Sequence, residues 1–179
     1  MSNKIVVLMA HSDMENSILN RRIKVELQHE KNILYKDLTA LYKDFAIDIK
    51  KEQNDLLDAK KIIFQFPMYW YSAPSILKRW VDEVLSYGYS YEIDTSGEFQ
   101  ALALKDKEFQ MIITMGAKEE SFVGGDRLSV QECLNSYSYT AKILGMKELE
   151  PFLIYGAAYK KFSEDSLKTV MNRLKQTVL

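Results

Sequence analysis

The chain has 179 residues, of which 47% are hydrophobic and 27% are charged, a composition typical of one soluble globular domain. Its net charge of -1 argues against a broad basic surface for nucleic acid or an anionic membrane, and no apolar run approaches the roughly 20 residues of a membrane span. One cysteine and two histidines cannot form an internal disulfide or a recognisable zinc cluster, and the N-terminus lacks a signal-peptide layout. We therefore expect a single domain over residues 1–179 that is cytoplasmic, binds no metal and buries Cys133 as a small residue.

Strand-like and helix-like segments alternate along the chain. Continuous apolar runs, typical of strands buried on both faces of a parallel sheet, predict strands at 4–10, 32–38, 61–67, 108–116 and 148–156. Amphipathic or helix-prone segments lie at 16–28, 49–60, 74–85, 127–145 and 163–178. Gly145 is placed to cap the fourth of these helices, and Ser163 is placed to begin the fifth without a full capping box.

This alternation predicts an α/β fold built from βαβ units with right-handed crossovers. Five strands suit a flavodoxin-like three-layer sandwich, with a parallel sheet of order 2-1-3-4-5 and helices on both faces. Ligands on such sheets bind beyond the carboxyl ends of the strands, beside the first strand. The segments "AHSDMENSILN", "PMYWYSAP" and "TMGAKEESFVGG", which follow strands 1, 3 and 4, should therefore converge.

The first of these segments runs from His11 into a helix that begins near Ser17. Helix N-termini attract phosphate through unpaired N–H groups, and Ser12, Asn16, Ser17 and Asn20 add side-chain donors. The loop contains neither a P-loop nor a glycine-rich dinucleotide fingerprint, so the expected ligand group is a terminal monophosphate. The alternative is that Ser17 only caps the helix and His11 is an ordinary turn residue.

The second segment places three aromatic residues, Tyr69, Trp70 and Tyr71, directly after a buried strand. Neighbouring residues point in different directions, so these rings cannot all belong to the core. They could pack on a flat heteroaromatic ligand, since aromatic contacts contribute about 0.5–1.5 kcal/mol beyond burial. They could also form an aromatic cluster between helix and sheet, or a dimer contact.

The third segment begins with Thr114 and Gly116, small residues that let a ligand approach the backbone closely. Gly124 and Gly125 suggest a flexible turn over the site, although an ordinary strand-to-helix connection is the alternative. Residues 87–104 form a tyrosine-rich, loop-like insertion that either covers the site or reaches across a dimer interface.

No acid–base pair stands out in the sequence. Asp82 and Glu83 lie on a helix with no histidine near them. Phosphate donors and aromatic walls without such a pair suggest that a cofactor carries the chemistry.

The stretch "FPMYWYSAPSILKRWVDEVLSYGYSY" resembles the signature of the NAD(P)H:quinone oxidoreductase family, flavin enzymes of flavodoxin-like fold that are usually homodimers. The resemblance extends over most of the chain and is strongest to the short bacterial branch. That branch includes the ancillary quinone reductases of glutathione-gated potassium-efflux systems and general-stress NAD(P)H oxidoreductases. "AHSDMENSILN" resembles the family's phosphate loop, and "LGMKELEPFLIYG" resembles its fifth strand.

The resemblance implies the site residues by position. The flavin would be held by His11, Ser17, Ile18, Leu19, Asn20, Pro67, Met68, Tyr69, Trp70, Tyr71, Thr114, Met115, Gly116 and Ala117. Residues 68–71 would line the ring mostly through backbone N–H groups. The substrate pocket would comprise Trp70, Tyr71, Tyr91 and Phe122, with Tyr91 contributed to the site of the partner. No catalytic side chain is implied, because the flavin carries the chemistry.

The implied activity is that of an NAD(P)H dehydrogenase (quinone). Hydride would pass from NADH or NADPH through FMN to a quinone, or to a similar azo or nitro acceptor, by a ping-pong mechanism. FMN is expected rather than FAD, because the chain lacks the C-terminal extension that longer members use near adenine. The implied partners are a second copy of the chain and a transporter that would bring it to the inner face of the membrane; nucleic acid is not expected.

Two other functions remain open at this point. One is a regulatory ancillary subunit of a potassium-efflux transporter. The other is a flavodoxin-type electron carrier, against which the net charge of -1 argues, because such carriers tend to be strongly acidic.

Overall fold

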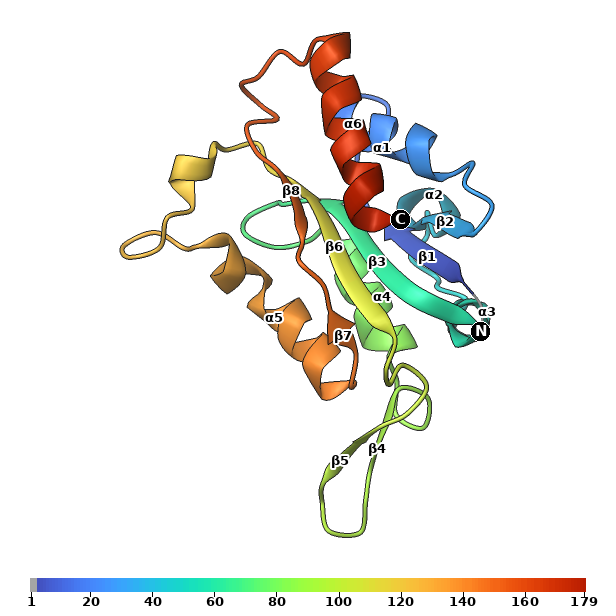
Figure 1. Ribbon diagram of the computed structural model, residues 1–179. Coiled ribbons are helices and arrows are strands. Elements are labelled where there is room, and N and C mark those ends of the chain that lie inside the picture. The colour runs from blue at the N-terminus through green and yellow to red at the C-terminus, as the bar shows by residue number, and fades with distance from the viewer. Residues whose placement is uncertain (1–2) are drawn as a thin grey trace.

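A parallel sheet forms the centre of the computed structural model, which describes residues 3–179 (Figure 1). Its strands are β1 (Lys4–Met9), β2 (Ile33–Asp37), β3 (Ala59–Pro67), β6 (Glu108–Thr114), β7 (Lys147–Glu148) and β8 (Phe152–Ile154). They run in the order β2-β1-β3-β6, with β7 and β8 both parallel to β6. The predicted order 2-1-3-4-5 is confirmed, because β7 and β8 together occupy the fifth position.

The fifth strand differs from its prediction because it is divided in two. β7 pairs with the start of β6 and β8 pairs with its end. Pro151 lies between them and has no N–H group to donate to a ladder. The carbonyl of Glu150 turns to a side chain instead and accepts a hydrogen bond of 2.8 Å from the Gln110 amide.

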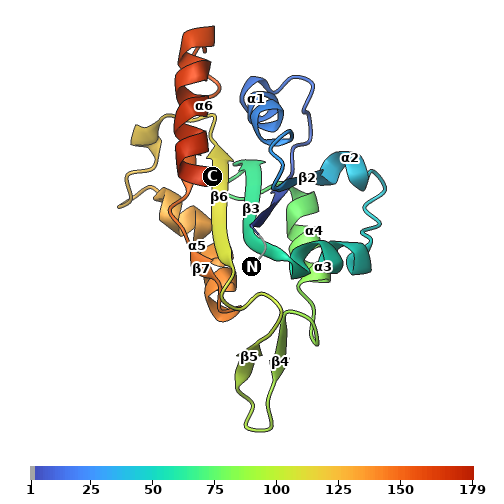
Figure 2. The same cartoon turned by 45° about the vertical axis from the view of Figure 1, so that its right-hand side comes forward.

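Helices cover both faces of the sheet, as Figure 2 shows. Helices α1 (Ile18–Leu27) and α6 (Glu164–Val178) pack on one face, where Leu19, Ile23 and Leu27 meet Leu167, Met171 and Leu174. The other face carries α3 (Ile49–Leu57), α4 (Ser75–Val84) and α5 (Val130–Ile143), together with the short α2 (Leu38–Leu41). Each face therefore has its own apolar core, which explains why the strands are apolar on both sides.

The predicted helix ends are confirmed. Ser163 caps α6 by accepting a hydrogen bond from the Ser166 N–H group, and no capping box forms there. Gly145, with φ of +68°, ends α5, and the next residue, Met146, donates back to the Ala141 carbonyl at 2.9 Å. Cys133 is buried on α5, and burial raises the pKa of its thiol, so it is the unreactive core residue expected. Within residues 3–179, none of the helices has both the length and the hydropathy to cross a bilayer.

The tyrosine-rich insertion forms a β-hairpin where the sequence predicted a loop. Strands β4 (Tyr91–Ile93) and β5 (Phe99–Ala101) pair antiparallel, and the Tyr91 ring stacks on Phe99 with centroids 4.6 Å apart. The hairpin projects from the end of the sheet where β6 begins, away from the carboxyl ends of the strands (Figure 1). It therefore does not cover the site of its own chain.

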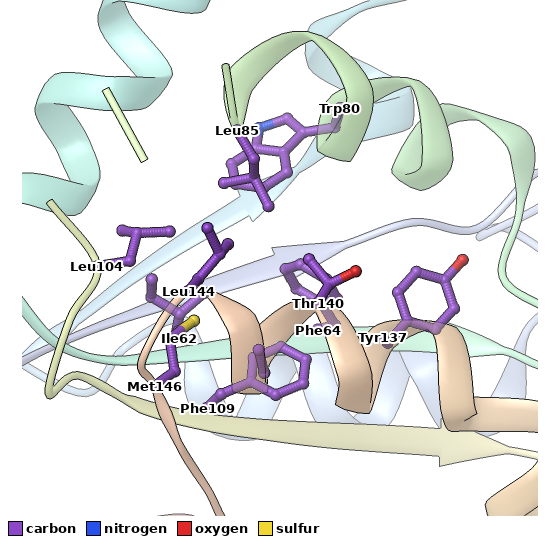
Figure 3. A pocket seen from close by; sticks show the side chains of 11 residues that line it. Ile62, Phe64, Trp80, Leu85, Leu104, Phe109, Tyr137, Thr140, Leu144 and Met146 are labelled. Carbon is purple, nitrogen blue, oxygen red and sulfur yellow. The ribbon is translucent and has the colours of Figure 1, made fainter. Parts of the chain in front are cut away.

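A small cavity lies in the core between α4 and α5 (Figure 3). Trp80 from α4 lines it on one side, Phe64 of β3 and Tyr137 from α5 line it on the other, and its volume is about 20 Å³. The lining is almost wholly apolar, so a water molecule would find few partners there. This space is a packing gap and is too small to hold an organic ligand.

A buried ionic cluster joins β2 to the helices beside it. Lys36 forms a salt bridge of 2.7 Å with Glu52, whose side chain is 1% exposed, and a second one with Asp55. The Glu52 carboxylate also accepts hydrogen bonds from the Tyr42 hydroxyl and, at 2.9 Å, from the Trp80 indole. Every partner of Glu52 comes from a different element or loop, so this carboxylate ties α3 to β2 and α4.

Replacing Lys36 by Met should destabilise the protein by about 3–5 kcal/mol, because the Glu52 charge would stay buried without its cation. Urea unfolding measures this loss. The matched control is Lys78→Met, which breaks an exposed pair with Asp82 and should cost less than about 1 kcal/mol. Equal losses in the two variants would contradict the assigned role of the cluster.

Candidate functional site

The loops that follow β1, β3 and β6 meet at the carboxyl end of the sheet and enclose a pocket of about 360 Å³. This volume lies within the range of about 300–1,000 Å³ that is usual for small-molecule sites. Most of the predicted cofactor residues line it: His11, Ser17, Ile18, Leu19, Asn20, Pro67, Met68, Tyr69, Thr114 and Gly116. Trp70, Tyr71, Met115 and Ala117 lie in the same loops but outside the lining, and the Met115 side chain belongs to the core.

A fourth wall was not predicted from the sequence. It comes from the segment after β8, through Ala157, Ala158 and Phe162. Backbone hydrogen bonds of 2.8 Å, from Gly156 to Ala117 and from Ala157 to Met115, join this segment to the loop after β6. The rule that ligands bind at the carboxyl ends of strands would have found this wall, had it been applied to the fifth strand as well.

The N-terminus of α1 forms one end of the pocket. Ser17 caps the helix, and its hydroxyl accepts a hydrogen bond of 3.2 Å from the Asn20 N–H group. The N–H groups of Ile18 and Leu19 have no acceptor within residues 3–179, and both residues line the pocket. Free N–H groups and the positive end of the helix dipole favour an anion here.

A buried chain of polar side chains lies beneath the pocket. The Tyr35 hydroxyl donates to the Gln65 side-chain carbonyl at 2.7 Å, and the Gln65 amide donates to the Asn20 side-chain carbonyl at 3.2 Å. The Asn20 amide donates in turn to the Thr114 hydroxyl at 2.9 Å. Because the Thr114 oxygen accepts this bond, its own hydrogen is available to a ligand.

Tyr35 and Gln65 were missed by the sequence analysis. A glutamine inside the apolar run "KIIFQFP" was the available signal, because a polar side chain in a strand buried on both faces needs a buried partner.

His11 contributes a neutral imidazole to the pocket. Burial lowers its pKa below the ordinary value, and this outweighs the opposing effect of Asp13 and Asp37. The Nδ1 atom accepts a hydrogen bond of 3.0 Å from the Asp13 N–H group, so the neutral ring carries its hydrogen on Nε2. The ring also meets Tyr69 edge-on, with centroids 6.1 Å apart.

The aromatic segment is a tight hairpin turn with an unfavourable backbone. Tyr69 and Ser72 exchange backbone hydrogen bonds of 2.8 and 3.0 Å. Between them, Trp70 has φ of +47° and Tyr71 has φ of +65°, the signs of a type I′ turn, which favours Asn and Gly. Trp70 is also 93% exposed. A strained turn that displays a large aromatic ring to solvent is typical of a binding site.

Backbone donors at the pocket are fewer than predicted. The N–H group of Met68 donates to the Thr114 carbonyl at 2.9 Å, and that of Tyr69 is used within the turn. The N–H groups of Trp70, Tyr71, Gly116 and Ala117 have no acceptor in the described part of the chain. A ligand would therefore find free backbone donors at Ile18, Leu19 and Gly116 in the lining, and at Trp70, Tyr71 and Ala117 beside it.

The expected substrate residues are not gathered in one place within a single chain. Trp70 and Tyr71 lie on the turn, and Phe122 is half-buried beside Tyr155, with centroids 6.1 Å apart. Tyr91 lies in the β4–β5 hairpin at the far end of the molecule (Figure 1). Gly124 and Gly125 do not line the pocket.

Residues 3–178 match the family described as having a flavodoxin-like fold, so the chain belongs to that family. It is 37% identical over 173 residues to the uncharacterized NAD(P)H oxidoreductase YrkL of Bacillus subtilis (strain 168), covering 96% of this chain and 95% of that protein. It is 34% identical over 160 residues to the glutathione-regulated potassium-efflux system ancillary protein KefG of Yersinia pestis (strain Pestoides F), covering 88% and 85%.

Two solved structures are similar over nearly the whole chain. General stress protein 14 of Treponema denticola, crystallised in complex with FMN, matches with a TM-score of 0.81 at 27% identity, covering 98% of this chain and 95% of that one. A thermophilic tryptophan halogenase described as from Streptomycin violaceusniger matches with a TM-score of 0.86 at 35% identity, covering 97% and 98%. The family match and the relatives confirm the predicted resemblance to NAD(P)H oxidoreductases, and the two structures confirm the fold.

The buried His11 should make the protein less stable at mildly acidic pH. Its pKa is lower in the folded state than in the unfolded chain, so the unfolded state binds the proton first as the pH falls. The free energy of unfolding should therefore decrease as the pH falls below about 6.5. Urea unfolding at several pH values should show a shallower decrease for His11→Gln, whereas the exposed-site control His29→Gln should keep the full decrease.

The strained turn should be easy to stabilise. Replacing Trp70 by Asn together with Tyr71 by Gly should raise the free energy of unfolding by about 1–2 kcal/mol, because positive φ values suit the new residues. Thermal unfolding measures this gain. The control Tyr71→Phe keeps a side chain at positive φ, so its free energy of unfolding should not rise. An equal rise in this control would show that the positive φ values carry no strain.

Proposed function

We propose that the chain is an FMN-dependent NAD(P)H oxidoreductase that passes two electrons to a quinone or a similar flat acceptor. One observation carries this proposal: a single pocket joins the free N–H groups of a helix N-terminus to Tyr69, the first residue of an exposed aromatic turn. The helix terminus suits a phosphate monoester, and the turn suits a planar ring. The complex of general stress protein 14 with FMN and the name of YrkL support the same assignment.

The residues of the pocket fit FMN. The Ile18 and Leu19 N–H groups and the Ser17 hydroxyl would hold the phosphate. The Thr114 hydroxyl and the N–H groups of Gly116 and Ala117 would donate to the polar edge of the ring. Bound FMN would supply the redox chemistry, accepting electrons from NADH or NADPH and releasing them to the acceptor. The role of this chain is to orient the nicotinamide donor and the acceptor. It also provides hydrogen-bond donors at the edge of the flavin ring where negative charge develops.

A homodimer would complete the site. Trp70 is almost fully exposed in one chain, and Tyr91 does not line the pocket of its own chain. A second copy of the chain could bring its hairpin against the aromatic turn, which would place Tyr91 beside Trp70 and Tyr71 as the sequence predicted.

A second role as an ancillary transporter subunit is supported by the similarity to KefG. Under this role the protein would be cytoplasmic and would reach the membrane through a potassium-efflux transporter. The two roles are compatible, since the pocket and a docking face can coexist on one subunit. A carrier of the flavodoxin type is less favoured, because a net charge of -1 provides little electrostatic steering to redox partners.

Spectroscopy of the purified protein tests the oxidoreductase. FMN should bind and give a yellow protein that bleaches with NADH or NADPH in the absence of oxygen and recovers when a quinone is added. Ser17→Asp should lower the affinity for FMN by about tenfold or more, because it keeps an N-cap side chain but puts a carboxylate beside the phosphate. Riboflavin, which lacks the phosphate, should lose little affinity in this variant.

The matched control is Ser163→Asp at the N-cap of α6, which should leave FMN affinity unchanged. A wild-type protein that binds no flavin, or a Ser17→Asp variant with unchanged FMN affinity, would refute the proposed site.

A further inference from the structure

A second, larger pocket lies at the free edge of the sheet. It is beside the pocket proposed to hold FMN, which we call the FMN pocket. It has a volume of about 580 Å³ and is bounded by β8, the loop after β6 and helix α6. We call it the edge pocket. In Figure 1 these three elements lie side by side at the edge of the sheet that carries β8.

The edge pocket and the FMN pocket share a wall. Phe162 lines both of them, and the segment from 156 to 162 separates them. Tyr155 also connects the edge pocket to the predicted substrate pocket. It lines the edge pocket and contacts Phe122, one of the predicted substrate residues. An elongated ligand could therefore place one ring in the substrate pocket beside FMN and extend its other end into the edge pocket.

The charges around the edge pocket suit a phosphorylated ligand. Lys118, Lys160 and Arg173 line it, and none of them forms an ion pair within residues 3–179. The guanidinium of Arg173 lies over the Phe152 ring, 5.8 Å from its centroid, which holds it at the pocket. Lysine and arginine without carboxylate partners are the usual ligands of phosphate.

Two carboxylates, those of Glu119 and Glu120, also line the edge pocket. Both lie on the short 3-10 helix η1 (Glu119–Ser121), on the side of the loop after β6. Carboxylates can accept hydrogen bonds from ribose hydroxyls, so a nucleotide would use both kinds of charge. Three cations and two carboxylates therefore line the pocket, and the excess of positive charge favours a ligand with an additional phosphate.

We propose that the edge pocket binds the adenosine-phosphate part of the nicotinamide dinucleotide and that its cations make NADPH the preferred electron donor. This inference rests on the proposed function, because the nicotinamide must lie at the FMN while the rest of the dinucleotide lies elsewhere. Lys160 and Arg173 contact the 2′-phosphate, which NADH lacks. Leu153 and Tyr155, which line the pocket and are only partly buried, offer apolar surface to the adenine.

Steady-state kinetics of the FMN-loaded protein test this. In the double variant Lys160→Gln with Arg173→Gln, the KM for NADPH should rise by about tenfold or more, because charge-assisted bonds to phosphate are lost. The kcat and the KM for NADH should change by less than about twofold, since neither the FMN site nor the phosphates common to both donors are altered. Lys168→Gln, which removes an exposed cation of α6 outside the pocket, should keep both KM values.

The probe 2′,5′-ADP separates this inference from the proposed function. Calorimetry should detect its binding to the wild-type protein with or without FMN, and about tenfold weaker binding to the double variant. If the protein binds FMN and oxidises NADPH but the double variant keeps its KM and its affinity for 2′,5′-ADP, the edge pocket is not the nucleotide site. If the wild-type protein binds 2′,5′-ADP but no FMN, the proposed function fails while the edge pocket stands.

Discussion

The hydrogen bond from the Asn20 amide to the Thr114 hydroxyl holds the site together. It joins the first turn of α1 to the end of β6 across 2.9 Å, and Gln65 of β3 fixes the Asn20 side chain from the other side. Because these groups are buried, each would cost stability if its partner were lost, so they define one arrangement of the three elements. The anion end of the pocket and its polar wall are thereby kept at a fixed separation, which a rigid phosphorylated ring requires.

The hydrogen-bonded residues Asn20, Gln65 and Thr114 form a rigid base of the pocket, whereas the aromatic turn beside it is strained and exposed. The aromatic turn has two side chains at positive φ, and Trp70 gains almost nothing from burial within the single chain. Such strain is retained only where the surrounding structure imposes it, and it is concentrated at sites of function. Here the Tyr69–Ser72 hydrogen bonds and the start of α4 hold the turn, so the rings stay available to a ligand or a second subunit.

The same division between a rigid base and adaptable walls extends to the edge of the sheet. The buried Lys36–Glu52 pair fixes the helices on the side of β2, far from the edge that carries β8. On the β8 side, Pro151 interrupts the last strand, and exposed cations of a loop and a helix line an open pocket. Charges that are paired and buried stabilise the fold, whereas unpaired charges at a pocket remain available for recognition.

Much of this could be predicted from local patterns in the sequence. Nearby residues determine the apolar runs, the helix caps at Ser17 and Ser163, and the loops that follow β1, β3 and β6. The strand order follows from the βαβ alternation. The hairpin in residues 87–104 was missed because its pairing depends on cross-strand contacts such as Tyr91 on Phe99.

Only the tertiary structure decided which side chains meet. The bonds of Gln65 and Tyr35 to the site, the wall from Ala157 to Phe162 and the two pockets that share it join residues far apart in the chain. Their distances and burial arise when the layers pack, because a linear pattern shows which residues are polar but not which partner each one finds.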